Sequence, residues 1–344
     1  MDQKNSITLV DKKDMLGAVE SMPRQLIEGV RRGRGAGLPK FSPTGVIVCG
    51  LGGSAIGGDL LHEWLWSISR LPCEVCRSYS LPAYAGKSSL VIVASYSGNT
   101  EETLAMLEDA KKKRTRLLAI SSGGQLAKRA AAEGIPLVKI PSGIQPRASL
   151  GYMFGAMLGA LERSGIVDLG KQVEESAGML SEVVAGCKPS VRTKDNEAKM
   201  LAHRLFQSIP LVIGHGLSAP VAKRWANQFN ENSKVLAFAA SLPEFDHNEI
   251  VGWMQDPRTR VYSSIFLLHE APDPMRMRVE ATKAMIARVA ATCEVHSLGM
   301  SAMAKMLSLV LIGDYVSTYL GILRGVDPSS NQPIDELKAT LSGK

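Results

Sequence analysis

The sequence predicts an α/β fold: two doubly wound parallel-sheet domains in tandem, with helices on both faces and an additional C-terminal helix. Short apolar runs such as 46–48 and 90–94 are typical of parallel strands that are covered on both sides. Each run leads through a glycine- or serine-rich turn into a helical stretch, the order of right-handed crossovers. The pattern then repeats, because "VIVCGLGGS" from Val46 and "LVIGHGLS" from Leu211 share one strand–turn–helix order.

The elements of the first half follow in regular alternation. Apolar runs predict strands at 45–49, 73–81, 90–94, 116–120 and 135–141. Helices are expected after Gly53, from about Glu101, over 125–134 and over 148–165. Because all these turns follow strands, they belong at the carboxyl edge of the sheet, where open α/β sheets bind ligands.

The second half begins with a helical connector over about 165–207 and continues with strands at 210–214, 260–268 and 293–298. The apolar stretch 303–323 contains Lys305 and Asp314, and it therefore predicts a core helix rather than a membrane span. We place the domains at 1–165, with the candidate phosphate turns, and at 166–344, with the connector and the C-terminal helix.

Composition narrows the class of protein. The 344 residues are 45% hydrophobic and 21% charged, with a net charge of +7 that suits an anionic ligand. Nucleic acid is disfavoured, because the basic runs 31–34 and 111–116 lack interleaved aromatic residues. Five scattered cysteines and no recognisable signal peptide indicate a cytoplasmic protein. The single C-x-x-C, Cys73 and Cys76, has no second pair that would complete a zinc site.

The first glycine turn, Gly50 to Ala55, matches the dinucleotide fingerprint G-x-G-x-x-G/A only loosely. That fingerprint needs an acidic residue about 20 positions on, but Arg70 stands there and Glu74 lies inside the next strand. Two other interpretations stay open at this point. The turn could cradle a phosphate with its bare N–H groups, or its glycines could serve packing alone.

The stretch "SYSGNTEET" is the most informative turn. Ser95, Ser97 and Thr100 crowd a helix N-terminus, where hydroxyls, free N–H groups and the helix dipole together favour a phosphate. The structural alternative is a capping box made by Asn99 and Glu102. We favour phosphate binding, helped by Gly53 and Ser54 of the neighbouring turn. No Walker lysine follows either turn, which disfavours a nucleoside triphosphatase.

Candidates for acid–base chemistry lie elsewhere. Glu231 ends a predicted helix among amides, and His247 sits in a polar loop flanked by apolar residues. A metal held by Asp246, His247 and Glu249 is disfavoured, because adjacent loop positions rarely converge on one ion. Arg147 follows a proline at a strand-to-helix turn that suits an anion, and Lys338 lies near the C-terminus.

Six segments in order resemble the archaeal-type bifunctional phosphoglucose/phosphomannose isomerases, which are built from two sugar isomerase (SIS) domains. They are "GLGGSAIGGD", "SYSGNTEET", "QPRASLGY", "NQFNENSK", "PEFDHNEIVGW" and the closing "GVDP…IDELK". The resemblance spans nearly the whole chain. It implies an aldose–ketose isomerase with a sugar-phosphate cradle at the glycine turn, and no nicotinamide or other cofactor and no metal.

The resemblance also implies residue roles. Gly53, Ser54, Ser95, Ser97 and Thr100 would hold the substrate, and Arg147 would lie near the reacting carbons. Glu231 would be the base, His247 the ring-opening residue and Lys338 a C-terminal active-site lysine. In the family the histidine comes from the neighbouring subunit, so the expected partner is a second copy of the chain, with neither nucleic acid nor a membrane.

One segment departs from the family. A threonine and a proline usually follow "VDP", whereas this chain has "VDPSSNQP", in a region implicated in accepting mannose 6-phosphate. The expectation of mannose 6-phosphate as a substrate therefore depends on this segment, whereas that of glucose 6-phosphate does not. The competing hypothesis is a non-catalytic SIS protein that senses sugar phosphates, which should carry a DNA-binding helix-turn-helix; the first 45 residues show none. A glucosamine-6-phosphate synthase would need an N-terminal cysteine, which "MDQKNS" lacks.

Overall fold

The computed structural model describes residue 2 and residues 4–341, and the chain forms two compact units. The first unit consists of Glu20–Glu182 and Ser297–Ser308. The second unit combines Val183–His296 with the described residues of Met1–Val19 and Leu309–Lys344. The sequence prediction used one boundary, after residue 165, whereas the chain passes between units at four points. Three of these points lie inside helices, so no loop or linker marks them in the sequence.

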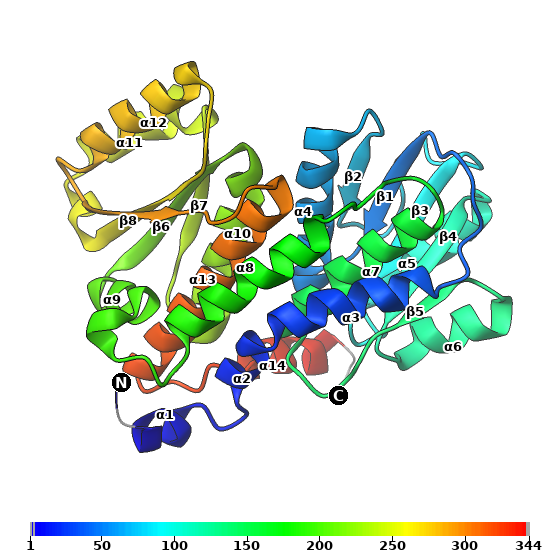
Figure 1. The fold of residues 1–344 in the computed structure, drawn as a ribbon, viewed down its shortest axis with the longest axis horizontal. Coiled ribbons are helices and arrows are strands. Elements are labelled where there is room, and N and C mark those ends of the chain that lie inside the picture. The colour runs from blue at the N-terminus through cyan, green and yellow to red at the C-terminus, as the bar shows by residue number, and fades with distance from the viewer. Residues whose placement is uncertain (1, 3, 342–344) are drawn as a thin grey trace. The chain divides into compact units, whose positions relative to one another are not determined.

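The first unit is built on a parallel five-stranded sheet in the order β2-β1-β3-β4-β5 (Figure 1). Its strands are β1 (Gly45–Cys49), β2 (Cys73–Cys76), β3 (Ser89–Ala94), β4 (Arg116–Ser121) and β5 (Leu137–Lys139). β1 and β3 pair in parallel with Val46 opposite Leu90, and all of β3 is buried. The apolar runs therefore form central strands covered on both faces, as predicted.

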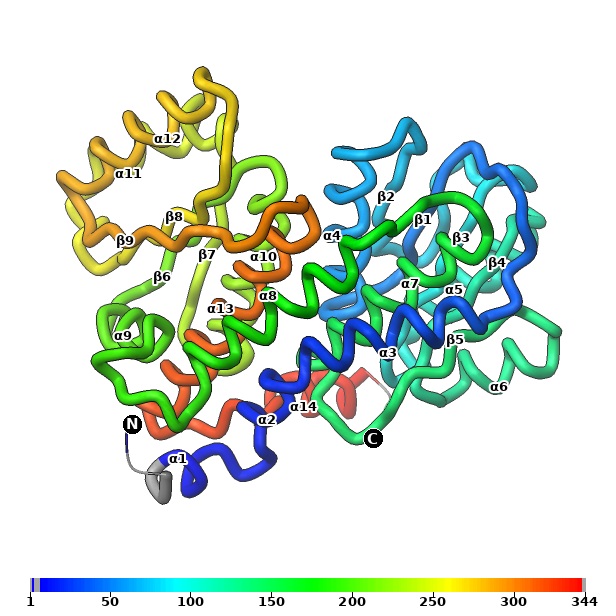
Figure 2. The backbone as a smooth tube through the Cα atoms, viewed as in Figure 1, coloured from blue at the N-terminus to red at the C-terminus, as the bar shows by residue number. Residues whose placement is uncertain are grey.

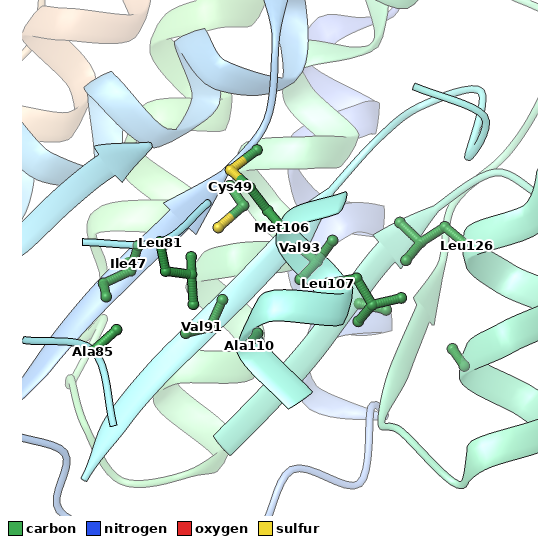
Figure 3. Close-up of a cluster of buried hydrophobic side chains, with 12 residues drawn as sticks. Ile47, Cys49, Leu81, Ala85, Val91, Val93, Met106, Leu107, Ala110 and Leu126 are labelled. Carbon is green, nitrogen blue, oxygen red and sulfur yellow. The ribbon is translucent and has the colours of Figure 1, made fainter. Parts of the chain in front are cut away.

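Helices cover both faces of this sheet. They are α3 (Met22–Arg34), α4 (Gly52–Ile68), α5 (Glu101–Lys112), α6 (Gly124–Glu133), α7 (Leu150–Arg163) and most of α8 (Gln172–Cys187). One core packs Val91 and Val93 of β3 against Met106 and Leu107 of α5 (Figure 3). On another side α3 and α7 run side by side (Figure 1, Figure 2). A Cβ on Gly33 would lie 2.3 Å from the carbonyl oxygen of Ala156, so only glycine permits this helix contact.

The second unit repeats the architecture with a parallel four-stranded sheet in the order β7-β6-β8-β9. Its strands are β6 (Ile209–His215), β7 (Phe238–Leu242), β8 (Tyr262–Leu268) and β9 (Ala291–His296). Its helices include α1 (Lys4–Val10), α2 (Met15–Glu20), α9 (Glu197–Arg204), α10 (Ala219–Gln228), α11 (Glu249–Gln255), α12 (Asp273–Ile286) and α14 (Gln332–Leu341). The prediction of an α/β fold with two parallel sheets is confirmed.

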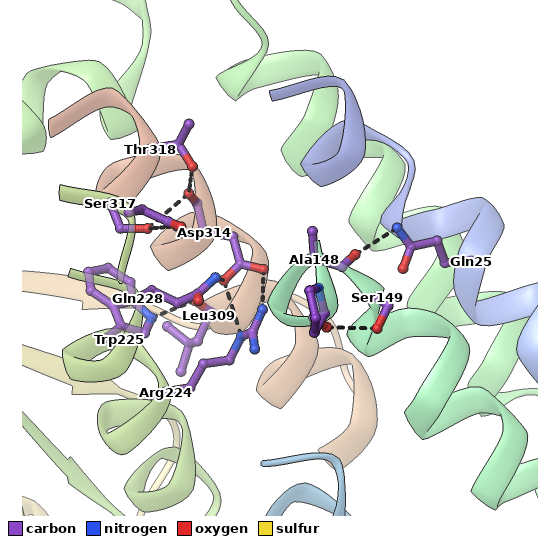
Figure 4. Close-up of polar contacts among 12 residues, drawn as sticks. Gln25, Ala148, Ser149, Arg224, Trp225, Gln228, Leu309, Asp314, Ser317 and Thr318 are labelled. Atoms are coloured by element: carbon purple, nitrogen blue, oxygen red, sulfur yellow. Dashed lines mark hydrogen bonds and ion pairs between the residues drawn. The ribbon is translucent and has the colours of Figure 1, made fainter. Parts of the chain in front are cut away.

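Helix α13 (Ala302–Leu323) is the core helix that the sequence predicts. Among the described residues it alone is long and apolar enough to cross a membrane, but 94% of its most apolar window is buried inside protein. Asp314, on this helix, pairs with Arg224 of α10 through both carboxylate oxygens, at 3.1 and 2.7 Å (Figure 4). The charged residue that argues against a membrane span is thus neutralised within the second unit.

The sequence analysis missed several elements, among them one helix and one strand of the sheets described above. Helix α3 has three arginines in its last turn, which drew attention to a basic run rather than to its apolar face. Strand β7, "FAASL", has small side chains and alternates between exposure and burial, so it lacks the β-branched run of a central strand.

Candidate active site

The turns after β1 and β3 lie next to each other at the carboxyl edge of the first sheet. After β1 the chain continues to β2 on one side and then to β3 on the other, so the topological switch point falls between β1 and β3. Ligands of such sheets bind at this point. The two turns are joined directly, because the Oγ of Ser54 accepts a hydrogen bond of 3.3 Å from the backbone N–H of Tyr96.

The hydroxyl turn is organised around Ser95. This buried side chain shares a hydrogen bond of 2.9 Å with the Oγ1 of Thr100, and its Oγ accepts one of 3.1 Å from the Gly98 N–H. Ser97 is exposed, and its Oγ accepts a hydrogen bond of 3.2 Å from the Asn99 N–H. Ser95 therefore shapes the turn, while Ser97 and the half-buried Thr100 hold hydroxyls at its surface.

The structure decides against the capping-box interpretation. Thr100, not Asn99, is the N-cap of α5, and among the described residues no side chain caps this helix. The Oδ1 of Asn99 instead accepts a hydrogen bond of 3.0 Å from the N–H of Gln125, at the start of α6. The first N–H groups of α5 are thus left for solvent or for a bound anion.

Arg147 is held against the glycine turn. It lies in the 3₁₀ turn Pro146–Ser149, and only 3% of it is exposed. A Cβ on Gly53 would lie 3.3 Å from the Cα of Arg147, so a residue without a side chain suits this approach. The Nε2 of Gln25 donates a hydrogen bond of 2.9 Å to the Ala148 carbonyl and secures the turn from α3 (Figure 4). The predicted residues of the first unit therefore gather around one switch point.

Glu231 lies in the second unit, where α10 ends. It is half-buried and sits in the middle of a π-helical turn, Phe229–Ser233. Lys234 follows in a left-handed conformation, and its Nζ donates to the carbonyl oxygens of Glu231 and Asp327, at 2.6 and 2.8 Å. This lysine joins two of the six family segments, "NQFNENSK" and "GVDP".

His247 ends the short 3₁₀ turn Glu244–His247 after β7, and its side chain is exposed. Both carboxylate oxygens of neighbouring Asp246 are engaged with α12: Oδ1 accepts from Thr282 at 2.8 Å and Oδ2 from Arg278 at 3.1 Å. Asp246 thus anchors the turn that presents His247. Burial raises the pKa of Glu249, which begins α11.

Lys338 lies on α14, and the predicted helix is present. The helical spacing of Ile334, Leu337 and Leu341 in the sequence predicts an apolar face through which this helix would dock. In the single chain those side chains are 41%, 59% and 76% exposed, and Lys338 is exposed as well. Glu231, His247 and Lys338 therefore come from three separate elements of the second unit.

The sequence comparison of the two glycine turns missed a difference between them. In the second unit the side chain of His215 accepts a hydrogen bond from the backbone N–H of Ser218, and Ser218 Oγ accepts one of 3.0 Å from the His215 N–H. Burial, with a contribution from neighbouring His269, lowers the pKa of His215 to about 4. The second turn thus satisfies its own donors, whereas the first leaves its helix N-terminus uncapped by side chains among the described residues.

The two parallel-sheet units place the chain with the SIS class of phosphosugar isomerases in fold. Residues 194–341 match the family model described as the bacterial phospho-glucose isomerase C-terminal SIS domain. The chain is also similar in fold to tagatose-6-phosphate ketose/aldose isomerase from Escherichia coli, with a TM-score of 0.71, 16% identity, and coverage of 91% and 93% of the two chains.

Comparison with curated sequences places the chain more narrowly. It is 40% identical over 302 residues to a bifunctional phosphoglucose/phosphomannose isomerase from Caldicellulosiruptor bescii, covering 86% of this chain and 89% of that protein. It is 35% identical to the Aquifex aeolicus protein of the same name, covering 86% and 90%. The chain belongs to the bifunctional phosphoglucose/phosphomannose isomerase family, and it is an isomerase.

Proposed function

We propose that this chain interconverts glucose 6-phosphate and fructose 6-phosphate, and mannose 6-phosphate with the same ketose. The observation that carries this proposal is the hydroxyl turn before α5. Among the described residues no side chain caps the N-terminus of α5, and the turn adjoins Gly53 and Ser54. Such a turn suits the phosphate of a sugar. The two relatives described above carry both activities in their names.

Glu231 acts as the base. Once the pyranose ring is open, its carboxylate removes the proton from C2 of the aldose, and the C–H electron pair forms the C1–C2 double bond while the aldehyde oxygen gains negative charge. In the resulting cis-enediol(ate) the hydroxyl proton on the C2 oxygen passes to the C1 oxygen. Glu231 then returns the abstracted proton to C1, and the C2 oxygen becomes the ketone. The guanidinium of Arg147 stabilises the negative charge on these oxygens, so the proposal needs no metal.

Glucose 6-phosphate and mannose 6-phosphate share this enediol and differ only in the face of C2 that carries the proton. One base serves both sugars if the substrate rotates about C2–C3 in the site. The segment "VDPSSNQP" is where this chain departs from its family, so the ratio of the two activities depends on it.

We further propose that the protein is a cytoplasmic homodimer in which His247 serves the partner's site and opens the sugar ring. The exposure of His247, on a turn anchored by Asp246, supports this arrangement. Lys338 contributes a second polar group for ring opening or for binding the substrate's oxygens.

A coupled assay tests the function: fructose 6-phosphate is supplied, and glucose 6-phosphate and mannose 6-phosphate are measured separately. Glu231→Gln keeps shape and polarity but cannot act as a base, so its turnover should fall by several orders of magnitude while substrate still binds. Glu197→Gln, at an exposed glutamate of the same unit, is the matched control. A Glu231→Gln protein with more than about a tenth of the control's turnover would disprove the role of Glu231.

The shared site has its own experiment. Glu231→Gln and His247→Ala chains, each inactive alone, are unfolded together and refolded as mixed dimers. If each site takes its base and its histidine from different chains, a mixed dimer has one intact site and regains activity. If mixing restores nothing while mixed dimers form, the histidine and the base act within one chain.

A further inference from the structure

The end of α10 is unusual in the turn that carries Glu231. The helix widens into a π turn over Phe229–Ser233, and the chain leaves it through Lys234 at φ +53°. π turns are rare and are found often at functional sites. This one receives support from outside its own helix. Residues in a wider turn advance less around the axis, so Glu231 points in a direction that an α-helical continuation would not give it.

Helix α13 supplies that support through a buried relay. The Nδ2 of Asn232 donates a hydrogen bond of 3.0 Å to the Oγ of Ser317. The Oγ of Ser317 in turn donates one of 3.1 Å to the carbonyl of Asp314 (Figure 4). Asn232 and Ser317 have no exposed surface. Each bond thus forms away from water, where an unmet donor is costly and the geometry is tightly held.

Two more contacts from the same face of α13 hold the turn. The Oγ of Ser233 donates a hydrogen bond of 2.6 Å to the Ser317 carbonyl, and the Nε of Arg324 donates one of 3.1 Å to the Ser233 carbonyl. Between them, a Cβ on Gly321 would lie 2.4 Å from the carbonyl oxygen of Asn232. Ser317 and Gly321 lie on α13, and Arg324 directly follows its last residue. The three are spaced i, i+4, i+7, so they form one stripe along the end of this helix.

We propose that this stripe, Ser317, Gly321 and Arg324, positions the base of the isomerase, an inference that rests on the proposed role of Glu231. The three are positioning residues that hold the backbone on either side of the carboxylate. The stripe sets the direction of Glu231, and the first unit's turns hold the phosphate. Damage to the stripe therefore lowers kcat and leaves KM largely unchanged. Proton transfer is sensitive to such changes, since a misplacement of about 1 Å costs as much as a hundredfold in rate.

Ser317→Ala is the test, and Thr318→Ala is its matched control. Both residues are fully buried, and both hydroxyls donate to the Asp314 carbonyl, but only Ser317 also accepts from the turn that carries Glu231. We expect Ser317→Ala to lower kcat about tenfold or more with KM within about twofold, and Thr318→Ala to change kcat less than about threefold. Thermal unfolding shows whether the two proteins are equally folded.

Deuterium exchange adds a readout that a general loss of stability does not move. When the reaction runs in D₂O, a well-placed base returns the substrate's own proton, and a displaced base exchanges it with solvent first. Ser317→Ala should raise the deuterium content of the product above that of wild type and of Thr318→Ala. Gly321→Ala, which pushes the Asn232 carbonyl away, should act in the same direction.

The outcomes separate the two levels of inference. If Glu231→Gln abolishes turnover but Ser317→Ala matches Thr318→Ala in kcat and in deuterium content, the positioning stripe is overturned and Glu231 remains the base. If Glu231→Gln stays active, the proposed function itself fails. Should Ser317→Ala not fold, Gly321→Ser and the deuterium content of its product decide the question in the same way.

Discussion

The hydroxyl turn makes the sharpest prediction, because the structure separates its binding role from its structural role. Ser97 is exposed, and its Oγ accepts a single hydrogen bond within the turn, from the Asn99 N–H. Ser97→Ala therefore costs the fold little, about 0.5 kcal/mol or less, as exposed substitutions do. A hydrogen bond to a charged phosphate is worth about 1.5–3 kcal/mol, so KM for glucose 6-phosphate should rise roughly tenfold to a hundredfold.

The assay measures initial rates of the coupled reaction over a wide range of substrate, together with thermal unfolding of the same preparations. Ser88→Ala is the control, because Ser88 is also exposed and precedes the same strand, β3, at its opposite end. We expect the control to keep both its KM and its melting temperature. The Ser97 variant should have a higher KM, but its melting temperature should stay within about 2 °C of that of wild type.

Thr100→Ala completes the comparison. A capping threonine replaced by alanine usually costs about 1 kcal/mol of stability, but Thr100 makes no such cap and loses only its bond to Ser95. KM should again rise. If KM stays unchanged in both variants while the melting temperature falls, the turn is structural and the phosphate site lies elsewhere.

Asp314→Ala leaves the guanidinium of Arg224 without its buried carboxylate and should cost about 3–5 kcal/mol by denaturant unfolding, against about 1 kcal/mol or less for exposed Asp273→Ala. The folded-state pKa of His215, about 4, lies below its ordinary 6.5, so the unfolded state takes up a proton first as the pH falls. The free energy of unfolding should therefore be highest above pH 6.5 and decrease toward pH 4 by up to about 3 kcal/mol. Ending the chain after residue 333, or Lys338→Ala alone, should leave a folded protein by circular dichroism with little isomerase activity. Exhaustive chelation should leave activity intact.

Each of these has an opposing result. If Asp314→Ala and Asp273→Ala lower the free energy of unfolding equally, burial does not strengthen the ion pair of Asp314. His215→Asn keeps an acceptor for the Ser218 N–H, but its side chain does not titrate. If its free energy of unfolding falls between pH 6.5 and 4 as steeply as that of wild type, another group causes the pH dependence. Near-normal turnover of the truncated chain would remove Lys338 from the site. Inactivation by a chelator, reversed by zinc or manganese, would require a metal in the mechanism.

The sequence by itself determined the fold class and the positions of the turns. Burial on both faces leaves a continuous apolar run such as Val46 to Cys49, and a strand followed by glycines and a helix is visible within about fifteen residues. These signals are local, so they need no knowledge of distant contacts. They led to the hydroxyl turn, to Arg147 and to the second parallel sheet.

Only the tertiary structure decided between the contacts that these local signals allow equally. "NTEE" fits a capping box, but Asn99 bonds to the start of α6, 26 residues away. The two glycine turns look alike in sequence, yet in the second turn the side chain of His215 accepts a hydrogen bond from the backbone N–H of Ser218. The π turn around Glu231 depends on Ser317 and Gly321, more than 80 residues further along the chain. The physical reason is the same for Asn99 and for the π turn: a hydrogen bond or a close backbone approach depends on which distant group packing brings near, and neighbouring residues do not encode that choice. The contact of His215 with Ser218 is local, and the strand–turn–helix pattern alone does not distinguish it.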